Sequence, residues 1–141
     1  MKIVLASDHA GFKLKESVKK YLLLNKKIEI IDLGVDSEVS VDYPLYGIKA
    51  GEFIRDNKAD KGIIICGTGI GISIAANKVK GVRAALCYDK FTAEMSRKHN
   101  DANVLVLSGR NTSRRKAIKL IKLFLTTDFE KGRHLKRLKM F

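Results

Sequence analysis

One cysteine of this chain lies directly between a β-branched run and a glycine-rich loop. The run is Ile63–Ile65, the cysteine is Cys66, and the loop is Gly67–Gly71. A strand, a glycine loop and a helix in this order direct free backbone amides and the positive end of a helix dipole at one point. A thiol at that point is expected to have a pKa below its free value of about 8.5, because the thiolate is stabilised. The segment therefore predicts an anion-binding loop with a base or nucleophile beside it.

The same segment has two structural interpretations, and both stay open at this point. A buried cysteine commonly acts as a small hydrophobic side chain. A glycine-rich turn between a strand and a helix can also serve close packing alone. The chemistry of Cys66 thus depends on which other polar residues the fold brings to its loop.

Apolar runs and helical periodicities alternate along the whole chain. Strands are expected at 3–6, 28–33, 63–66, 83–87 and 104–107, and helices at 12–25, 44–57, 73–78, 89–98, around 117–124 and at about 128–141. Five strands separated by helices predict a three-layer α/β/α, Rossmann-like single domain with a five-stranded parallel sheet. This domain is expected to span residues 1–141, and its last helix is expected to pack on a partner subunit.

The carboxyl ends of the expected strands carry a small set of polar side chains. Asp8 and His9 follow the first strand, and Arg110 follows the last one. Ligands of parallel sheets bind at these ends, so these residues are expected beside the loop that follows Cys66. His99 precedes the last strand instead. It is therefore expected at the amino ends of the strands, on the side of the sheet opposite to Cys66, which indicates a site that two subunits share.

Several of these residues also have ordinary structural roles. Asp8 is suited to cap a helix, and His99 can cap the carboxyl end of its own helix. Tyr43, next to Pro44, can simply pack at the start of a helix. The individual residues therefore leave a functional and a structural interpretation side by side.

Positive charge is concentrated near the end of the chain. The net charge is +13, and residues 110–141 hold eleven Lys and Arg against two acidic residues. A basic nucleic-acid-binding module is one explanation, but these lysines alternate with apolar positions as on a solvated helix face, and no zinc spacing or nucleic-acid motif is present. Arg133 and Arg137 lie one helical turn apart and can instead hold one phosphate group. A pair of solvated surface residues is the structural alternative.

The remaining bulk properties indicate a cytoplasmic protein that does not enter a membrane. No apolar run approaches the roughly 20 residues of a bilayer span, and Asp8 follows the first apolar run too soon for a secretory signal. Cys66 and Cys87 are too few for a disulfide framework, which makes a reducing compartment the simplest location.

Five segments together resemble one family, the type B ribose-5-phosphate isomerases, which belong with the galactose-6-phosphate and allose-6-phosphate isomerases. The matching segments are Asp8-His9-Ala10-Gly11-Phe12, Asp42-Tyr43-Pro44, the run from Cys66 to Lys78, the run from Ser96 to Leu105, and Gly132-Arg133-His134. The resemblance extends from the first strand to the last helix in the same order.

The resemblance implies an aldose–ketose isomerase, an intramolecular oxidoreductase that interconverts D-ribose 5-phosphate and D-ribulose 5-phosphate through an enediolate. It implies no metal and no organic cofactor. Cys66 would be the base that moves a proton between C1 and C2, Thr68 would pass a proton between the sugar oxygens, and His99 would open the furanose ring. Substrate binding would fall to Asp8, His9, Tyr43, Gly67, Thr68, Gly69, Ile70, Gly71, Asn100, Arg110, Arg133 and Arg137.

The resemblance also implies a homodimer with shared active sites, and it leaves a tetramer open. Some relatives carry a glutamate base where this chain has Ile72, so Cys66 places the chain with the cysteine subtype. An isomerase of a six-carbon sugar phosphate, allose 6-phosphate or galactose 6-phosphate, remains the nearest alternative function.

Two other function classes use loops or topologies of this kind. Gly67–Gly71 lacks the third glycine at the spacing of a dinucleotide-binding loop, and it follows the third strand rather than the first. A phospho-receiver domain needs an aspartate where Cys66 stands. Both classes are disfavoured, and a nucleic-acid-binding module stays as the alternative from a different class.

Overall fold

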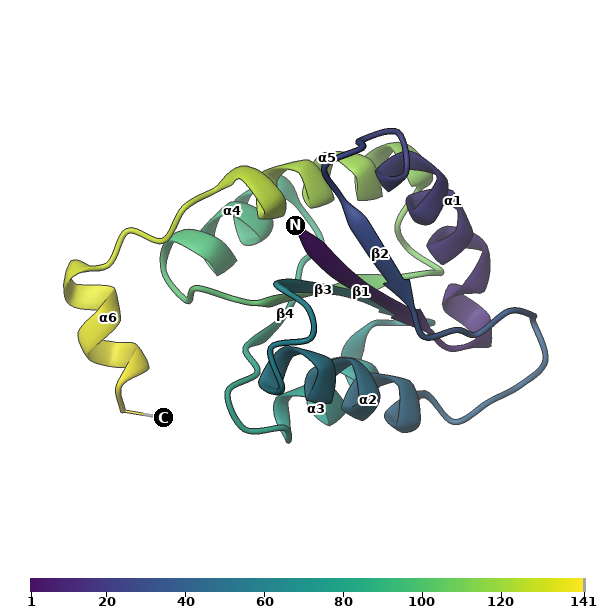
Figure 1. The fold of residues 1–141 in the computed structure, drawn as a ribbon, viewed down its shortest axis with the longest axis horizontal. Helices are drawn as coiled ribbons and strands as arrows, with labels where there is room; N and C mark the ends of the chain where they lie inside the picture. Colours follow the sequence, from purple (N-terminus) through teal and green to yellow (C-terminus); the bar gives the residue numbers. More distant parts are fainter. Residues whose placement is uncertain (141) are drawn as a thin grey trace.

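A parallel sheet lies between two layers of helices in the computed structural model, which describes residues 1–140 (Figure 1). The strands are β1 (Lys2–Ser7), β2 (Glu29–Asp32), β3 (Lys61–Cys66), β4 (Ala84–Leu86) and β5 (Val104–Ser108). Their order across the sheet is β2-β1-β3-β5-β4, and all pairs are parallel. The predicted three-layer α/β/α, Rossmann-like architecture is confirmed.

Helices cover both faces of this sheet. They are α1 (Phe12–Leu22), α2 (Tyr43–Arg55), α3 (Ile70–Asn77), α4 (Lys90–Lys98), α5 (Arg114–Thr126) and α6 (Gly132–Leu138), with a short 3-10 turn at His9–Gly11. α1 and α5 pack on one face and α2 and α3 on the other, whereas α6 projects away from the sheet on the side far from α1 (Figure 1). None of the described helices is long and apolar enough to cross a membrane.

The strands are buried on both sides because their apolar residues run without interruption. In β3, the side chains of Ile63 and Ile65 join the core under α1 and α5, and those of Ile64 and Cys66 join the core under α2 and α3. This alternation follows from the period of two along a strand. It directs the Cys66 side chain toward the layer that contains α3.

Several expected boundaries were wrong by a few residues. The helix expected at 12–25 ends at Leu22, and the helix expected at 73–78 begins earlier, at Ile70. The largest error concerns the last helix, which was expected from about 128. Residues 128–131 are not helical, because Lys131 has a φ of +60° and the Glu130 amide donates to the Lys98 carbonyl at 3.1 Å instead of continuing a helix. The expected end of that helix, Phe141, lies outside the described residues.

A buried lysine joins α1 to the end of β2. The Lys15 ammonium contacts both carboxylate oxygens of Asp32 at 3.0 Å and a Glu16 oxygen at 2.8 Å, and its side chain is only 2% exposed. Lys19 also reaches Asp32, at 2.7 Å. Burial alone raises the pKa of the Asp32 carboxyl, but hydrogen bonds from Lys19, the Gly34 amide and Lys15 outweigh it and hold that pKa below its ordinary value.

We expect Asp32→Asn to destabilise the fold by about 2–3 kcal/mol, because the buried Lys15 charge keeps only Glu16 as an anionic partner. Lys19→Met is the matched control and should change stability by less than about 1 kcal/mol, because Lys19 is partly exposed. Because folding lowers the pKa of Asp32, its contribution is present above the unfolded value of about 3.9 and disappears as the pH falls through the folded value. Urea unfolding of both variants between pH 3 and pH 7 measures this, and equal losses in the two variants would contradict it.

Candidate active site

Three loops meet at the carboxyl edge of the sheet, after β1, β3 and β5. The backbones of these loops approach one another so closely that two positions, Gly11 and Gly109, have no room for a side chain. A Cβ atom on Gly11 would lie 2.5 Å from the Ile65 carbonyl oxygen, and one on Gly109 would lie 2.6 Å from the Ala10 carbonyl oxygen. The backbones of the three loops therefore pack against one another around the end of β3, where Cys66 lies.

Cys66 faces an amide of its own loop. The Gly69 N–H donates to Cys66 Sγ at 3.1 Å, and the thiol is buried. Gly69 has a φ of +83°, a conformation that L-residues rarely adopt, and this turn lets α3 begin at the next residue. The Ile70 amide donates to Thr68 Oγ1 at 3.3 Å, and the Gly71 and Ile72 amides come too early in α3 to reach a carbonyl of the helix. The loop therefore combines a sulfur with donors that favour negative charge.

Tyr43 and Arg110 lie against the same loop. The Tyr43 ring covers Gly71 so closely that a Cβ atom there would be 2.5 Å from it. The Arg110 guanidinium lies beside Gly67, with Nε 3.4 Å from the position of a Cβ atom, and the Arg110 amide donates to the Gly67 carbonyl at 3.1 Å. The loop thus has an aromatic side chain on one side and a cation on the other.

Asp8 and His9 end β1 at this edge of the sheet. Asp8 is buried, and its Oδ1 accepts from the Gly11 amide at 2.9 Å, so it has the capping role that was the structural alternative. His9 Nδ1 accepts from the Val41 amide at 3.2 Å. This bond places the proton of a neutral His9 ring on Nε2, where it can donate to a ligand.

His99 and Asn100 lie at the opposite edge of the sheet, as expected from their position before β5. His99 ends α4, and the Asn100 carbonyl accepts from Arg83 Nε at 3.0 Å near the start of β4. Cys66 pairs with Ser108 at the end of β5. The five residues of that strand alone separate the two edges by about 13 Å. One chain therefore does not bring His99 to its own Cys66.

The phosphate-binding candidates Arg133 and Arg137 also lie away from the loop. Both are exposed on α6, the helix that projects from the body in Figure 1. Within one chain the structure thus gathers the residues at the carboxyl ends of the strands. It leaves His99, Asn100, Arg133 and Arg137 as a second group.

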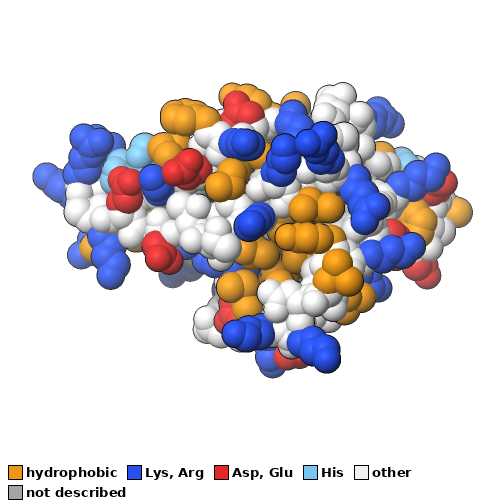
Figure 2. Space-filling view, turned by 90° about the horizontal axis from the view of Figure 1, so that it is seen from above, with side chains coloured by type: hydrophobic (Ala, Val, Ile, Leu, Met, Phe, Trp, Pro, Cys, Tyr) orange, Lys and Arg blue, Asp and Glu red, His pale blue; other side chains and the backbone are white. Residues whose placement is uncertain are grey.

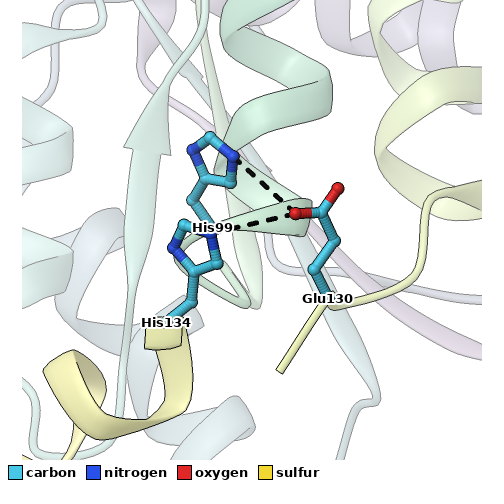
Figure 3. A group of neighbouring side chains, drawn as sticks. All are labelled: His99, Glu130 and His134. Atoms are coloured by element: carbon cyan, nitrogen blue, oxygen red, sulfur yellow. Dashed lines mark ion pairs between the residues drawn. The ribbon is translucent and has the colours of Figure 1, made fainter. Parts of the chain in front are cut away.

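The second group contains two residues that sequence reasoning did not select, Glu130 and His134. The His99 and His134 rings stack with centroids 4.2 Å apart and an interplanar angle of 7°, and both Nε2 atoms face Glu130 Oε2, at 4.0 and 3.8 Å (Figure 3). The spacing of Glu130 and His134, four residues apart, was a signal for a contact between them. The contact of His99 with these two residues could not be predicted from the sequence, because His99 lies at the end of another helix.

The surroundings of His134 disfavour its protonation. Burial lowers the pKa of its imidazole below the ordinary value, and repulsion from the neighbouring His99 and Arg133 side chains lowers it further. Glu130 acts in the opposite direction. The net effect is a mainly neutral imidazole at neutral pH.

On the face seen in Figure 2 the basic side chains do not form one separate patch. Figure 2 shows Lys and Arg side chains spread along one whole face with acidic side chains among them. Nucleic-acid-binding surfaces instead cluster basic residues on one face or stripe. This distribution favours a role in solvation for the lysines of this face.

The chain matches the family model described as Ribose/Galactose Isomerase over residues 3–141. It is 40% identical over 136 residues to the ribose-5-phosphate isomerase B of Escherichia coli, covering 96% of this chain and 91% of that protein. A ribose 5-phosphate isomerase of Thermotoga maritima has a similar structure, with a TM-score of 0.95 and 52% identity over 99% of this chain and 95% of that one. Ribose-5-phosphate isomerase B from Mycoplasma genitalium, solved with bound ribulose-5-phosphate, has a TM-score of 0.93 and 41% identity over 99% of this chain and 92% of that one.

The two cysteines should differ in reactivity toward iodoacetamide. Burial raises the pKa of the Cys87 thiol to about 11, so only about 0.1% of it is thiolate at pH 8, and we expect it to react at least about a hundredfold more slowly than an ordinary thiol. Cys66, which faces the Gly69 amide, should be labelled first. Peptide mass spectrometry over time measures both rates, with Cys66→Ser as the control. Labelling of Cys87 before Cys66 would contradict the expectation.

Proposed function

The chain belongs to the ribose/galactose isomerase family and is a sugar-phosphate isomerase, and we propose that it interconverts D-ribose 5-phosphate and D-ribulose 5-phosphate. Ribose 5-phosphate isomerases are prominent among the proteins that it resembles over nearly its whole length. The observation that carries the mechanism is the Gly69 amide donating to Cys66 Sγ at the mouth of α3. A cytoplasmic location fits the two free cysteines.

In the proposed mechanism the Cys66 thiolate removes the proton from C2 of the open-chain aldose. The C2–H electrons form the C1–C2 double bond, and the C1 carbonyl oxygen becomes an oxyanion. The amides of Gly67–Gly71 stabilise this charge, and each well-placed donor of that kind is worth about 3–4 kcal/mol in a transition state. Thr68, exposed at the loop, passes the O2 proton to O1, and the thiol returns its proton to C1. C1 is reduced and C2 oxidised, so no external electron acceptor is needed.

The furanose form of ribose 5-phosphate must open before this proton transfer. In the proposal His99 protonates the ring oxygen, which suits a side chain whose ordinary pKa is about 6.5. His99 lies at the wrong edge to serve its own Cys66, so it would serve the Cys66 of a partner subunit. Arg133 and Arg137, exposed on α6, would bind the phosphate of the same shared site.

A homodimer therefore accounts for both groups of residues. Apolar side chains are exposed beside the loop, among them Ile70 and Ile74 on α3 and Leu45 on α2. An exposed apolar surface next to a site commonly marks an interaction surface. The proposed dimer would cover this surface and place His99 of one subunit near the loop of the other.

Proton exchange separates the proposed base from the proposed ring-opening group. Ribulose 5-phosphate has no five-membered ring to open, so exchange of its C1 proton with D2O needs Cys66 but not His99. We expect Cys66→Ala to lose at least about a hundredfold in this exchange, with Cys87→Ala as the matched control that keeps it. His99→Ala should keep the exchange and lose turnover of ribose 5-phosphate. Proton NMR in D2O and a coupled assay measure the two rates.

Two results would contradict this assignment. Exchange that survives in Cys66→Ala would remove Cys66 as the base. Equal losses of exchange and of aldose turnover in His99→Ala would remove the ring-opening role. The same coupled assay with allose 6-phosphate tests the six-carbon alternative. A higher kcat/KM for allose 6-phosphate than for ribose 5-phosphate would mean that the six-carbon sugar is the substrate.

Subunit exchange tests the shared site. Mixing the inactive Cys66→Ala and His99→Ala proteins should give heterodimers with one intact site each, and random exchange restores about a quarter of native activity. Native mass spectrometry verifies the exchange, and a coupled assay with ribose 5-phosphate measures the recovery. No recovery after verified exchange would mean that each site lies within one chain.

A further inference from the structure

Three side chains that commonly bind metal ions converge where α6 meets the end of α4. His99 ends α4, Glu130 lies in the loop before α6, and His134 lies within α6. Their ligand atoms all lie within 4.8 Å of one another, and the two Nε2 atoms face the same Glu130 oxygen (Figure 3). No other group of three such side chains within this distance occurs in residues 1–140.

We propose that His99, Glu130 and His134 bind an exchangeable divalent ion of the Zn²⁺ or Co²⁺ class. Two imidazoles and one carboxylate are a donor set that suits zinc and its neighbours, and three protein ligands leave a position for water. Mg²⁺ and Ca²⁺ are disfavoured because they require oxygen ligands.

The ligand atoms must move together by a few tenths of an ångström to hold one ion. In tetrahedral geometry two ligands at about 2.0–2.1 Å from Zn²⁺ are about 3.4 Å apart, and the two nitrogen–oxygen distances here are 4.0 and 3.8 Å. Parallel rings cannot both direct a lone pair at one ion, so one ring must rotate. His99 has room for this, with 38% of its side chain exposed, whereas His134 is 6% exposed and held in place.

The surroundings hold Glu130 in place and also limit the affinity. Its amide donates to the Lys98 carbonyl at 3.1 Å, and its other carboxylate oxygen, Oε1, lies 3.7 Å from the Lys98 ammonium. The Lys98 ammonium lies closer to Glu94 Oε1, at 2.8 Å, and its contact with Glu130 is to Oε1. Glu130 Oε2 therefore remains available to bind an ion. Lys98 and the arginines of α6 weaken cation binding, which is why the ion is exchangeable rather than structural.

Binding of the ion would control the reaction through His99. An ion on His99 Nε2 occupies the lone pair that would carry a proton to the sugar ring oxygen. This step rests on the proposed function of His99, whereas the ion site itself does not. Zn²⁺ is therefore expected to inhibit turnover of ribose 5-phosphate more strongly than exchange of the C1 proton of ribulose 5-phosphate.

Titration of the metal-free protein with Co²⁺, followed by visible absorption, tests the site without an activity assay. We expect d–d bands without a sulfur-to-cobalt band, and Glu130→Gln and His134→Gln should each weaken binding by at least about tenfold. Glu94→Gln is the matched carboxylate control, because it also contacts Lys98. His9→Gln is the imidazole control, at the other edge of the sheet. Both controls should bind Co²⁺ as the native protein does.

The site is wrong if Glu130→Gln binds Co²⁺ as tightly as Glu94→Gln, or if the bands show cobalt on sulfur. Circular dichroism confirms that the variants are folded, and Glu130, which is exposed, can be replaced without opening the core. If Zn²⁺ inhibits the His134→Gln variant as strongly as it inhibits the native protein, the ion acts at another place. The proposed regulation of turnover through His99 would then be wrong. If the protein binds Co²⁺ as expected but does not act on ribose 5-phosphate, the ion site is supported and only the proposed function is contradicted.

Discussion

The chemistry proposed for this chain depends on how one buried strand ends. β3 is apolar on both faces, so its backbone direction is determined by packing under two layers of helices. The chain must then turn into α3 within a few residues, and Gly69 makes this possible with a φ of +83°. The same turn aims the Gly69 amide at Cys66 Sγ. Packing of the core and polarisation of the thiol are therefore consequences of one turn, and any side chain at Gly69 would disturb both.

The parallel sheet also determines which residues cannot meet. The two ends of its strands lie on opposite sides of the domain, so a residue that precedes β5 does not meet the last residue of β3 in the same chain. Cys66 and His99 are separated in this way. If both act on one sugar, the second must come from another copy of the chain. The shared site in the proposed function therefore follows from the topology of the sheet, once both residues are assigned to one reaction.

Local pattern predicted most of the fold because the strands are long apolar runs and the helices have a clear period. The Cys66 loop was predicted correctly as a strand–glycine–helix junction for the same reason. The end of the chain was not, because its structure depends on contacts distant in sequence. The Glu130 amide bonds to the carbonyl of Lys98, and His134 stacks on His99. Neither contact leaves a signal in the residues around 130.

These distant contacts attach α6 to its own chain at few points. The helix is attached to the rest of its own chain mainly through the stack on His99 and the bond from Glu130, while Leu135 and Met140 are exposed. Segments with few buried contacts open easily. Phosphate-binding arginines on such a segment would be poorly positioned in an isolated chain. Packing of the exposed apolar residues on a second subunit would fix the helix and orient Arg133 and Arg137 in a single step, so assembly and phosphate binding would stabilise each other.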